Sequence, residues 1–276
     1  MTEGDRQPVL KFDNVTLSFD EQRVLDSISF EVWPGQSRIL LGAAGSGKTV
    51  LLKVAMGLVK PDSGAVYLFG KNLAGLRESE LFDLRSRVGM VFQEGGLFDS
   101  LNIEENVAYP LVNQRVLHCP PDEVRPKVEE TLTFVELEHT LDKFPSELSG
   151  GMRRRVGIAR AVVTEPPLVL YDSPTAGLDP ITSYTIMALV LKQRDLKRTT
   201  CMIVTHRFQD GHMMVNYLYN PRTGEAERTG SNGGQTYEGT VFMVLREGRL
   251  VFEGTQDELE AAGDPYVSKF VRRSEH

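Results

Sequence analysis

The sequence predicts an α/β protein with a core of mixed, mainly parallel β-sheet, an antiparallel β-subdomain at its edge and an inserted α-helical subdomain. Short apolar runs at 37–42 and 168–172 are typical of strands buried on both faces, as in a parallel sheet. Alternating apolar residues at 9–19 and 27–32 predict strands of an antiparallel edge. Amphipathic helical patterns between 97 and about 163 predict the inserted helical part.

The remaining elements follow in order from changes in the apolar period. A helical pattern begins at Thr49, and its apolar face consists of Val50, Leu51, Val54 and Leu58. The turn-forming stretch at 57–64 ends this pattern. Further strands are predicted at 66–70, 87–93 and 201–206, and a helix is predicted over 183–193.

Length and composition limit the class of protein. The chain has 276 residues, of which 41% are hydrophobic, and this is enough for one large domain. We expect a loose N-terminal segment at 1–8, the domain at 9–260 and a tail at 261–276. The net charge of −7 disfavours nucleic acid as the main partner.

Cysteine usage and the apolar runs indicate a cellular setting. Cys119 and Cys201 lack metal-ligand spacing, which predicts free thiols in a reducing cytosol. No apolar run reaches the roughly 18 residues that cross a bilayer, and the first residues contain no apolar signal core. We therefore expect a cytosolic chain that reaches a membrane only through a partner.

A glycine-rich segment between a predicted strand and a predicted helix has the G-x-x-x-x-G-K-[ST] pattern of a phosphate-binding loop. Its residues are Gly42, Ala43, Ala44, Gly45, Ser46, Gly47, Lys48 and Thr49. Glycines let backbone N–H groups point inward, and the helix N-terminus adds partial positive charge. We expect Lys48 to reach the β- and γ-phosphates of ATP and the Thr49 hydroxyl to ligate Mg²⁺. The alternative, a chance glycine-rich turn, is disfavoured by the motifs that follow.

A carboxylate follows the apolar run at 168–172. Asp172 ends that run, as does the aspartate that assists magnesium in phosphate-loop ATPases. Taken alone, such an aspartate is more often a helix cap or a turn residue. Its position downstream of the phosphate loop favours the magnesium role.

A second anion-binding pattern indicates a protein family. Ser149, Gly150 and Gly151 precede a helical pattern and form part of Leu-Ser-Gly-Gly-Met. This stretch resembles the Leu-Ser-Gly-Gly-Gln signature of ATP-binding cassette (ABC) ATPases, and the resemblance covers about residues 8 to 260. It implies a head-to-tail homodimer in which Ser149, Gly150 and Gly151 contact the γ-phosphate bound by the other subunit. For most of the arginine run 153–155, a solvated helix face is the simpler interpretation.

The resemblance also assigns roles to single residues. It implies that Phe19 stacks on adenine, although a core strand residue is the alternative. Gln93 matches the glutamine that senses Mg²⁺ and the attacking water and links to a membrane partner. His206 matches the switch histidine at the γ-phosphate, and 176–179 matches the loop that crosses the dimer interface.

Ser173 departs from the family pattern, which has a catalytic glutamate at this position. A serine hydroxyl positions water but is a poor general base, and general-base help is worth roughly 10²- to 10⁴-fold. Phosphoryl transfer depends mostly on positioning and charge neutralisation, and the other expected groups are present. We therefore expect ATP binding and dimer closure with slow hydrolysis.

Two further segments resemble the Mla-type (maintenance of lipid asymmetry) phospholipid transport ATPases. They are 89–111, with Gln-x-Gly-x-Leu-Phe and Asn-Val-Ala-x-Pro-Leu, and the chain end at 253–270. This resemblance implies permease subunits in the inner membrane, a lipid-binding MCE-type protein and phospholipid movement between membranes. The polar segment 221–240 is longer than the family usually has. It is interpreted as a solvated hairpin tip, or alternatively as a contact for a small regulatory subunit.

Other functions stay open at this point. A nucleotide-gated clamp with little hydrolysis also fits Ser173. A further alternative is that the chain is the ATPase of an ABC importer for another substrate. A cassette of DNA repair or translation is disfavoured because the acidic chain has one cassette and no basic stripe.

Overall fold

The largest sheet of the computed structural model has six strands. The structure describes residues 7–113, 119–229 and 239–272. The strand order is β12 (Arg249–Gly254), β11 (Thr240–Arg246), β3 (Ser37–Gly42), β8 (Thr200–Thr205), β7 (Leu168–Asp172) and β6 (Val88–Val91). All neighbouring pairs are parallel except β11 and β12. The predicted parallel core is confirmed.

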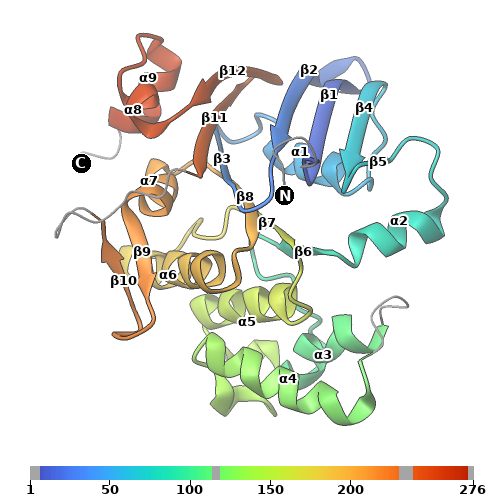
Figure 1. Ribbon diagram of the computed structural model, residues 1–276, viewed down its shortest axis with the longest axis vertical. Coiled ribbons are helices and arrows are strands. Elements are labelled where there is room, and N and C mark those ends of the chain that lie inside the picture. The colour runs from blue at the N-terminus through green and yellow to red at the C-terminus, as the bar shows by residue number, and fades with distance from the viewer. Residues whose placement is uncertain (1–6, 114–118, 230–238, 273–276) are drawn as a thin grey trace.

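An antiparallel sheet lies beside this core. Its order is β2 (Gln22–Val32), β1 (Leu10–Phe19), β4 (Ser63–Leu68) and β5 (Lys71–Asn72). The alternating pattern at 9–19 and 27–32 therefore predicted the right kind of strand, and β2 begins earlier than expected, at Gln22. Figure 1 shows this sheet at the opposite end of the molecule from helices α3, α4 and α5.

The helices cover the sheets and build the inserted part of the fold. They are α1 (Lys48–Ala55), α2 (Glu78–Arg85), α3 (Ile103–Asn113), α4 (Pro121–Phe134), α5 (Gly150–Val162), α6 (Pro180–Lys197), α7 (Phe208–Asn216), α8 (Gln256–Glu260) and α9 (Pro265–Arg272). Two 3₁₀ turns, Glu138–Thr140 and Pro145–Glu147, connect α4 to α5. Helices α3, α4 and α5 contact one another and form the helical subdomain, as expected for the segment from 97 to about 163.

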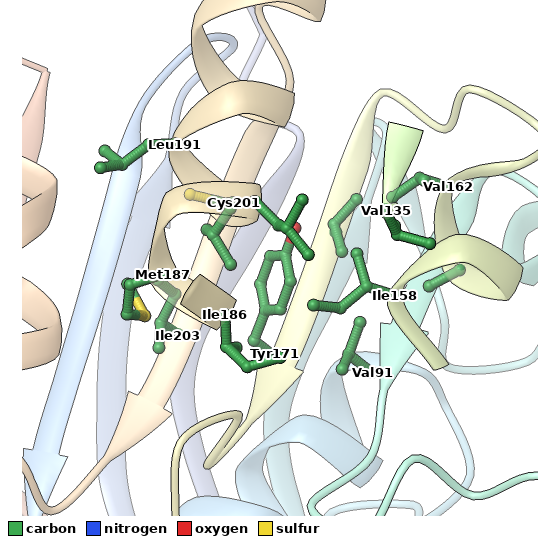
Figure 2. Close-up of a cluster of buried hydrophobic side chains, with 14 of the residues drawn as sticks. Val91, Val135, Ile158, Val162, Tyr171, Ile186, Met187, Leu191, Cys201 and Ile203 are labelled. Carbon is green, nitrogen blue, oxygen red and sulfur yellow. The ribbon is translucent and has the colours of Figure 1, made fainter. Parts of the chain in front are cut away.

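The central strands are buried on both faces, which explains their unbroken apolar runs. Along β3, Ile39 and Leu41 belong to one apolar cluster and Leu40 to the other. On the first face, the Tyr171 ring of β7 lies between Ile186 of α6 and Ile158 of α5, as Figure 2 shows. This packing holds the end of β7, where Asp172 follows Tyr171.

One element is shorter than its pattern suggested. Leu58 was expected on the apolar face of the first helix, but α1 ends at Ala55 and Leu58 is 57% exposed. Gly57 has a φ of +63° immediately before it. This left-handed conformation turns the chain away from the helix, so the apolar period no longer describes a face.

The end of the chain also has more structure than a tail suggests. Helix α9 lies within the segment 261–276, and its Val267 is fully buried. The side chains of Tyr266 and Phe270 pack against the same cluster. The expected loose segment at 1–8 falls almost entirely outside the described residues.

The polar segment at 221–240 begins as a hairpin. Strands β9 (Tyr217–Asn220) and β10 (Glu225–Arg228) form a two-stranded antiparallel sheet. Ala226 of β10 is buried, and its carbonyl accepts a hydrogen bond from the Tyr184 hydroxyl of α6 at 2.9 Å. The hairpin is therefore anchored on α6, while residues 230–238 lie outside the described part of the chain.

Candidate nucleotide-binding site

The predicted functional residues gather where four parallel strands end. The phosphate loop follows β3, His206 follows β8, Asp172 ends β7, and Gln93 lies two residues beyond β6. The register pairs Leu41 with Thr205 and Asp172 with Val204, so these ends lie at one edge of the sheet. Carboxyl ends of parallel strands are where α/β folds place ligand-binding groups.

The loop has the backbone shape that a phosphate cradle requires. Gly45 and Gly47 have φ values of +76° and +100°, in the left-handed region that favours glycine. A Cβ on Gly47 would lie 2.8 Å from the carbonyl oxygen of Val24, so no other residue fits there without a shift. Gly47 also caps α1, whose N-terminus therefore opens onto the loop.

Lys48 folds over this loop. Its ammonium donates hydrogen bonds to the carbonyl oxygens of Gly42 and Ala43 at 2.8 and 2.7 Å. Burial lowers the pKa of Lys48 from its ordinary value, and the Asp172 carboxylate opposes that shift. Phosphate oxygens brought to the loop would favour the charged ammonium for the same electrostatic reason.

The oxygen donors beside the loop fit a hard cation. Thr49 is exposed in the first turn of α1, and Asp172 is nearly buried at the end of β7. Gln93 is exposed and offers an amide oxygen. Hydroxyl, carboxylate and amide oxygens are the ligands that Mg²⁺ takes beside nucleotide phosphates. The residues present therefore fit Mg²⁺-ATP.

Ser173 is held in an uncommon conformation. Its φ is +49°, a left-handed value that costs a non-glycine residue about 1–2 kcal/mol. Its N–H donates to the Val204 carbonyl at 2.8 Å, and its hydroxyl donates to Asp172 Oδ1 at 3.3 Å. Local strain that is held this firmly is a common property of functional sites.

Ser149 begins the signature helix. Its hydroxyl oxygen accepts a hydrogen bond from the Met152 N–H at 3.2 Å and thereby caps α5. Gly150 and Gly151 form the first turn, where N–H groups and the helix dipole favour an anion. The hollow beside this turn is lined by Gly150, Glu94 and Gly177, and the phosphate-loop residues 42–49 are not part of it. This hollow therefore joins the signature turn to the loops after β6 and β7 of the same chain and does not include the phosphate loop.

The arginine run after the signature is not the solvated face that was expected. Arg154 is buried and donates to the Pro174 carbonyl at 2.9 Å. Arg153 and Arg155 are partly buried and donate to the carbonyls of Leu148 and Val135. These bonds tie α5 to neighbouring loops.

Phe19 lies at the end of β1 with 46% of its surface exposed, so it is not a core strand residue. Its stacking on adenine stays a prediction.

Sequence reasoning missed a buried polar group below the strand ends. Asp210 of α7 is 2% exposed and accepts hydrogen bonds from the hydroxyls of Thr175 and Thr205. Burial raises the pKa of Asp210, and the two threonine hydrogen bonds oppose that shift. No motif spacing marks an aspartate within a short helix, so the sequence offered no signal for this contact.

The fold and this strand-end constellation define an ATP-binding cassette. The chain belongs to the ABC transporter family, whose model matches residues 25–176. It is an ABC-type ATPase and the ATP-binding subunit of a transporter. None of the helices within the described ranges is long and apolar enough to cross a membrane.

The alignments with several named relatives extend over almost the whole chain. The intermembrane phospholipid transport system ATP-binding protein MlaF of Escherichia coli is 31% identical, over 94% of this chain and 86% of its own length. The TRIGALACTOSYLDIACYLGLYCEROL 3 protein of Arabidopsis thaliana is 32% identical, over 99% of this chain and 76% of its own length. The probable ribonucleotide transport ATP-binding protein mkl of Mycobacterium tuberculosis is 36% identical, over 98% of this chain and 68% of its own length.

Solved structures agree in fold. The dimeric post-hydrolysis state of the cassette MJ0796, bound to ADP and Pi, is 29% identical with a TM-score of 0.72, over 89% of this chain and 98% of that one. The cbiO1 protein of Clostridium perfringens is part of the ABC transporter complex cbiONQ. It is 27% identical with a TM-score of 0.75, over 97% of this chain and 94% of that one.

Proposed function

We propose that this chain is the ATPase subunit of a transporter that moves phospholipid between membranes. It acts as a homodimer on the cytoplasmic side of the inner membrane, bound to permease subunits, with an MCE-type lipid-binding protein and a small regulatory subunit as further partners. The observation that carries this proposal is a complete phosphate cradle in a chain that resembles MlaF over 94% of its length.

The residues at the strand ends divide the work of binding and hydrolysis. Lys48 neutralises the β- and γ-phosphates, while Thr49, Asp172 and Gln93 would hold Mg²⁺. His206 contacts the γ-phosphate, and Ser149, Gly150 and Gly151 close on it from the other subunit. Bound Mg²⁺ supplies charge neutralisation at the phosphates.

Ser173 makes hydrolysis slow in this scheme. Its hydroxyl already donates to Asp172 and lies next to the predicted magnesium site, where it positions water without accepting its proton. The second candidate, a nucleotide-gated clamp, follows from the same residue if turnover is negligible. Single-turnover hydrolysis of ATP by the full chain separates the two, because the clamp keeps its ATP intact.

An exposed aromatic groove lies beside the loop that contains Gln93 and fits an apolar helix of a permease. Phe92, Phe98 and Tyr109 line it and are each about two-fifths exposed. The rings of Phe98 and Tyr109 lie 4.7 Å apart, and the Arg160 guanidinium lies 5.4 Å from the Phe98 ring. Arg160 also donates to the Gly95 and Gly96 carbonyls, so the groove and the glutamine loop are joined.

The test is co-purification of the native complex followed by lipid analysis. We expect membrane proteins and bound phospholipid with the parent chain and their loss with Phe98→Asp, because a carboxylate disfavours an apolar anchor site. Leu196→Asp, at an exposed apolar position on α6, is the control and should retain both. Retention by Phe98→Asp contradicts the groove, and a complex free of phospholipid contradicts the substrate.

A further inference from the structure

Both chain neighbours of His206 are anchored in one buried hydrogen-bond network. On one side, the Thr205 hydroxyl donates to Asp210 Oδ2 at 2.7 Å. On the other, the Arg207 N–H donates to the Thr205 hydroxyl oxygen at 3.1 Å, and the Arg207 guanidinium lies 3.9 Å from Asp210 Oδ1. His206 itself is exposed at the sheet edge. Its backbone is therefore fixed from below, while its side chain stays free to meet a ligand.

The same network reaches the loop that follows Asp172 and Ser173. The Thr175 hydroxyl lies 2.9 and 2.8 Å from the two carboxylate oxygens of Asp210. The Arg207 guanidinium donates to the Thr175 carbonyl at 3.3 Å and to the Ser183 hydroxyl at 2.8 Å. Asp210 thus links the ends of β7 and β8, which carry the predicted magnesium and γ-phosphate groups.

Burial gives this link its rigidity. Asp210 is 2% exposed, and Thr175 and Thr205 are no more than 1% exposed. A buried carboxylate that loses hydrogen bonds carries a desolvation penalty, so the arrangement resists distortion. Because Asp210 lies below the surface where phosphates bind, its influence on the reaction passes through the groups it holds.

We infer that Asp210 is a positioning residue that sets His206 relative to Asp172 and Ser173 for hydrolysis. The inference rests on the proposed contact of His206 with the γ-phosphate. Since Ser173 supplies no general base, turnover depends on the placement of the remaining groups. A misplacement of about 1 Å in such a site costs on the order of 10²-fold in rate.

The first test compares Asp210→Asn with the parent in single-turnover hydrolysis of Mg²⁺-ATP by the full chain. The amide keeps the shape but accepts fewer hydrogen bonds and loses the charge opposite Arg207. We expect the rate to fall by roughly 10-fold or more, while the Kd for ATP changes less than about twofold. Thr175→Val, which removes one hydroxyl from the carboxylate, should act in the same direction.

A double-variant cycle separates positioning from loss of structure. In a His206→Ala background, Asp210→Asn should slow hydrolysis by less than about twofold, because the group that it positions is gone. Gln193→Met removes another buried hydrogen bond, from the last turns of α6 to Thr199 beyond the end of that helix, and is the control. It should lower the melting temperature and leave the rate per folded molecule unchanged.

Two outcomes overturn the inference. Equal proportional loss from Asp210→Asn in both backgrounds means that Asp210 acts through the fold or another group. An unchanged rate for Asp210→Asn means that the network does not position His206. If His206→Ala itself leaves the parent rate unchanged, the proposed role of His206 is what fails, and that single-variant result is distinct from the other two.

Discussion

At the scale of single residues, Ser173 is where chemistry and backbone conformation meet. The side chain lacks a carboxylate, yet the backbone keeps a left-handed φ of +49° and a hydrogen bond to Val204. The strand end thus retains a demanding geometry while the group it presents is a weak base. If only that group is missing, restoring a carboxylate should restore rate.

We predict that Ser173→Glu raises the rate of phosphate release by roughly 10- to 10³-fold, or about 1.4–4 kcal/mol of barrier. Affinity for ATP should change little, because the new carboxylate acts on water rather than on the bound phosphates. Ser173→Ala is the control and should cost far less than His206→Ala. A Ser173→Glu variant no faster than the parent shows that another group already serves as base.

At the scale of elements, α9 links the end of the chain to the nucleotide site. Val267 is buried in the same apolar cluster as the central strands. The Tyr266 hydroxyl donates to the Leu245 carbonyl at 3.2 Å and accepts from the Ala43 N–H of the phosphate loop at 3.4 Å. A segment whose composition suggested a tail therefore supports the loop from behind.

We predict that Val267→Asp lowers the free energy of unfolding by about 3 kcal/mol or more, because it removes apolar burial and places a carboxylate in a dry cluster. Urea denaturation followed by circular dichroism measures the change. The neighbouring exposed variant Lys269→Asp should stay within about 0.5 kcal/mol of the parent. Equal stability of all three chains would show that α9 is dispensable for the fold.

At the scale of the whole molecule, one chain holds two predicted anion-binding turns on different elements of the fold. The cradle lies at the end of β3, and Ser149 begins α5 in the helical subdomain. Figure 1 shows β3 in the upper half of the molecule and α5 in the lower half. The proposed head-to-tail homodimer would bring each cradle to the signature of the other subunit. The dimeric ADP-bound structure of the related cassette MJ0796 is consistent with such an assembly.

We predict that Ser149→Arg blocks ATP-dependent dimerisation and spares ATP binding by the monomer, because the long side chain fills the turn that should receive the other subunit's γ-phosphate. Light scattering with and without Mg²⁺-ATP measures the assembly state. Thr133→Arg, at an exposed position on α4, adds the same charge elsewhere and should dimerise normally. Dimerisation of Ser149→Arg at parent concentrations is the outcome against a head-to-tail sandwich.

The sequence alone determined the fold class, the phosphate loop and the strand-end residues Asp172, Gln93 and His206. These features are local: glycine spacing, apolar period and the residue after a strand are set by neighbours only a few positions away. Leu58 shows the limit of that information. The helical apolar period continues in the amino-acid sequence to Leu58, although α1 ends at Ala55 and Gly57 has a left-handed conformation.

Only the tertiary structure decided which distant groups meet. Thr175 and Asp210 are 35 residues apart, and Tyr266 and Ala43 are 223 apart. Neither pair has a local pattern, because each contact depends on the order in which β3, β7 and β8 lie in the sheet. The burial of Arg154 likewise depends on α5 packing beside the loop after β7. Sequence spacing identified the groups predicted to touch the nucleotide, and the long-range packing of the fold determined the groups that hold them in place.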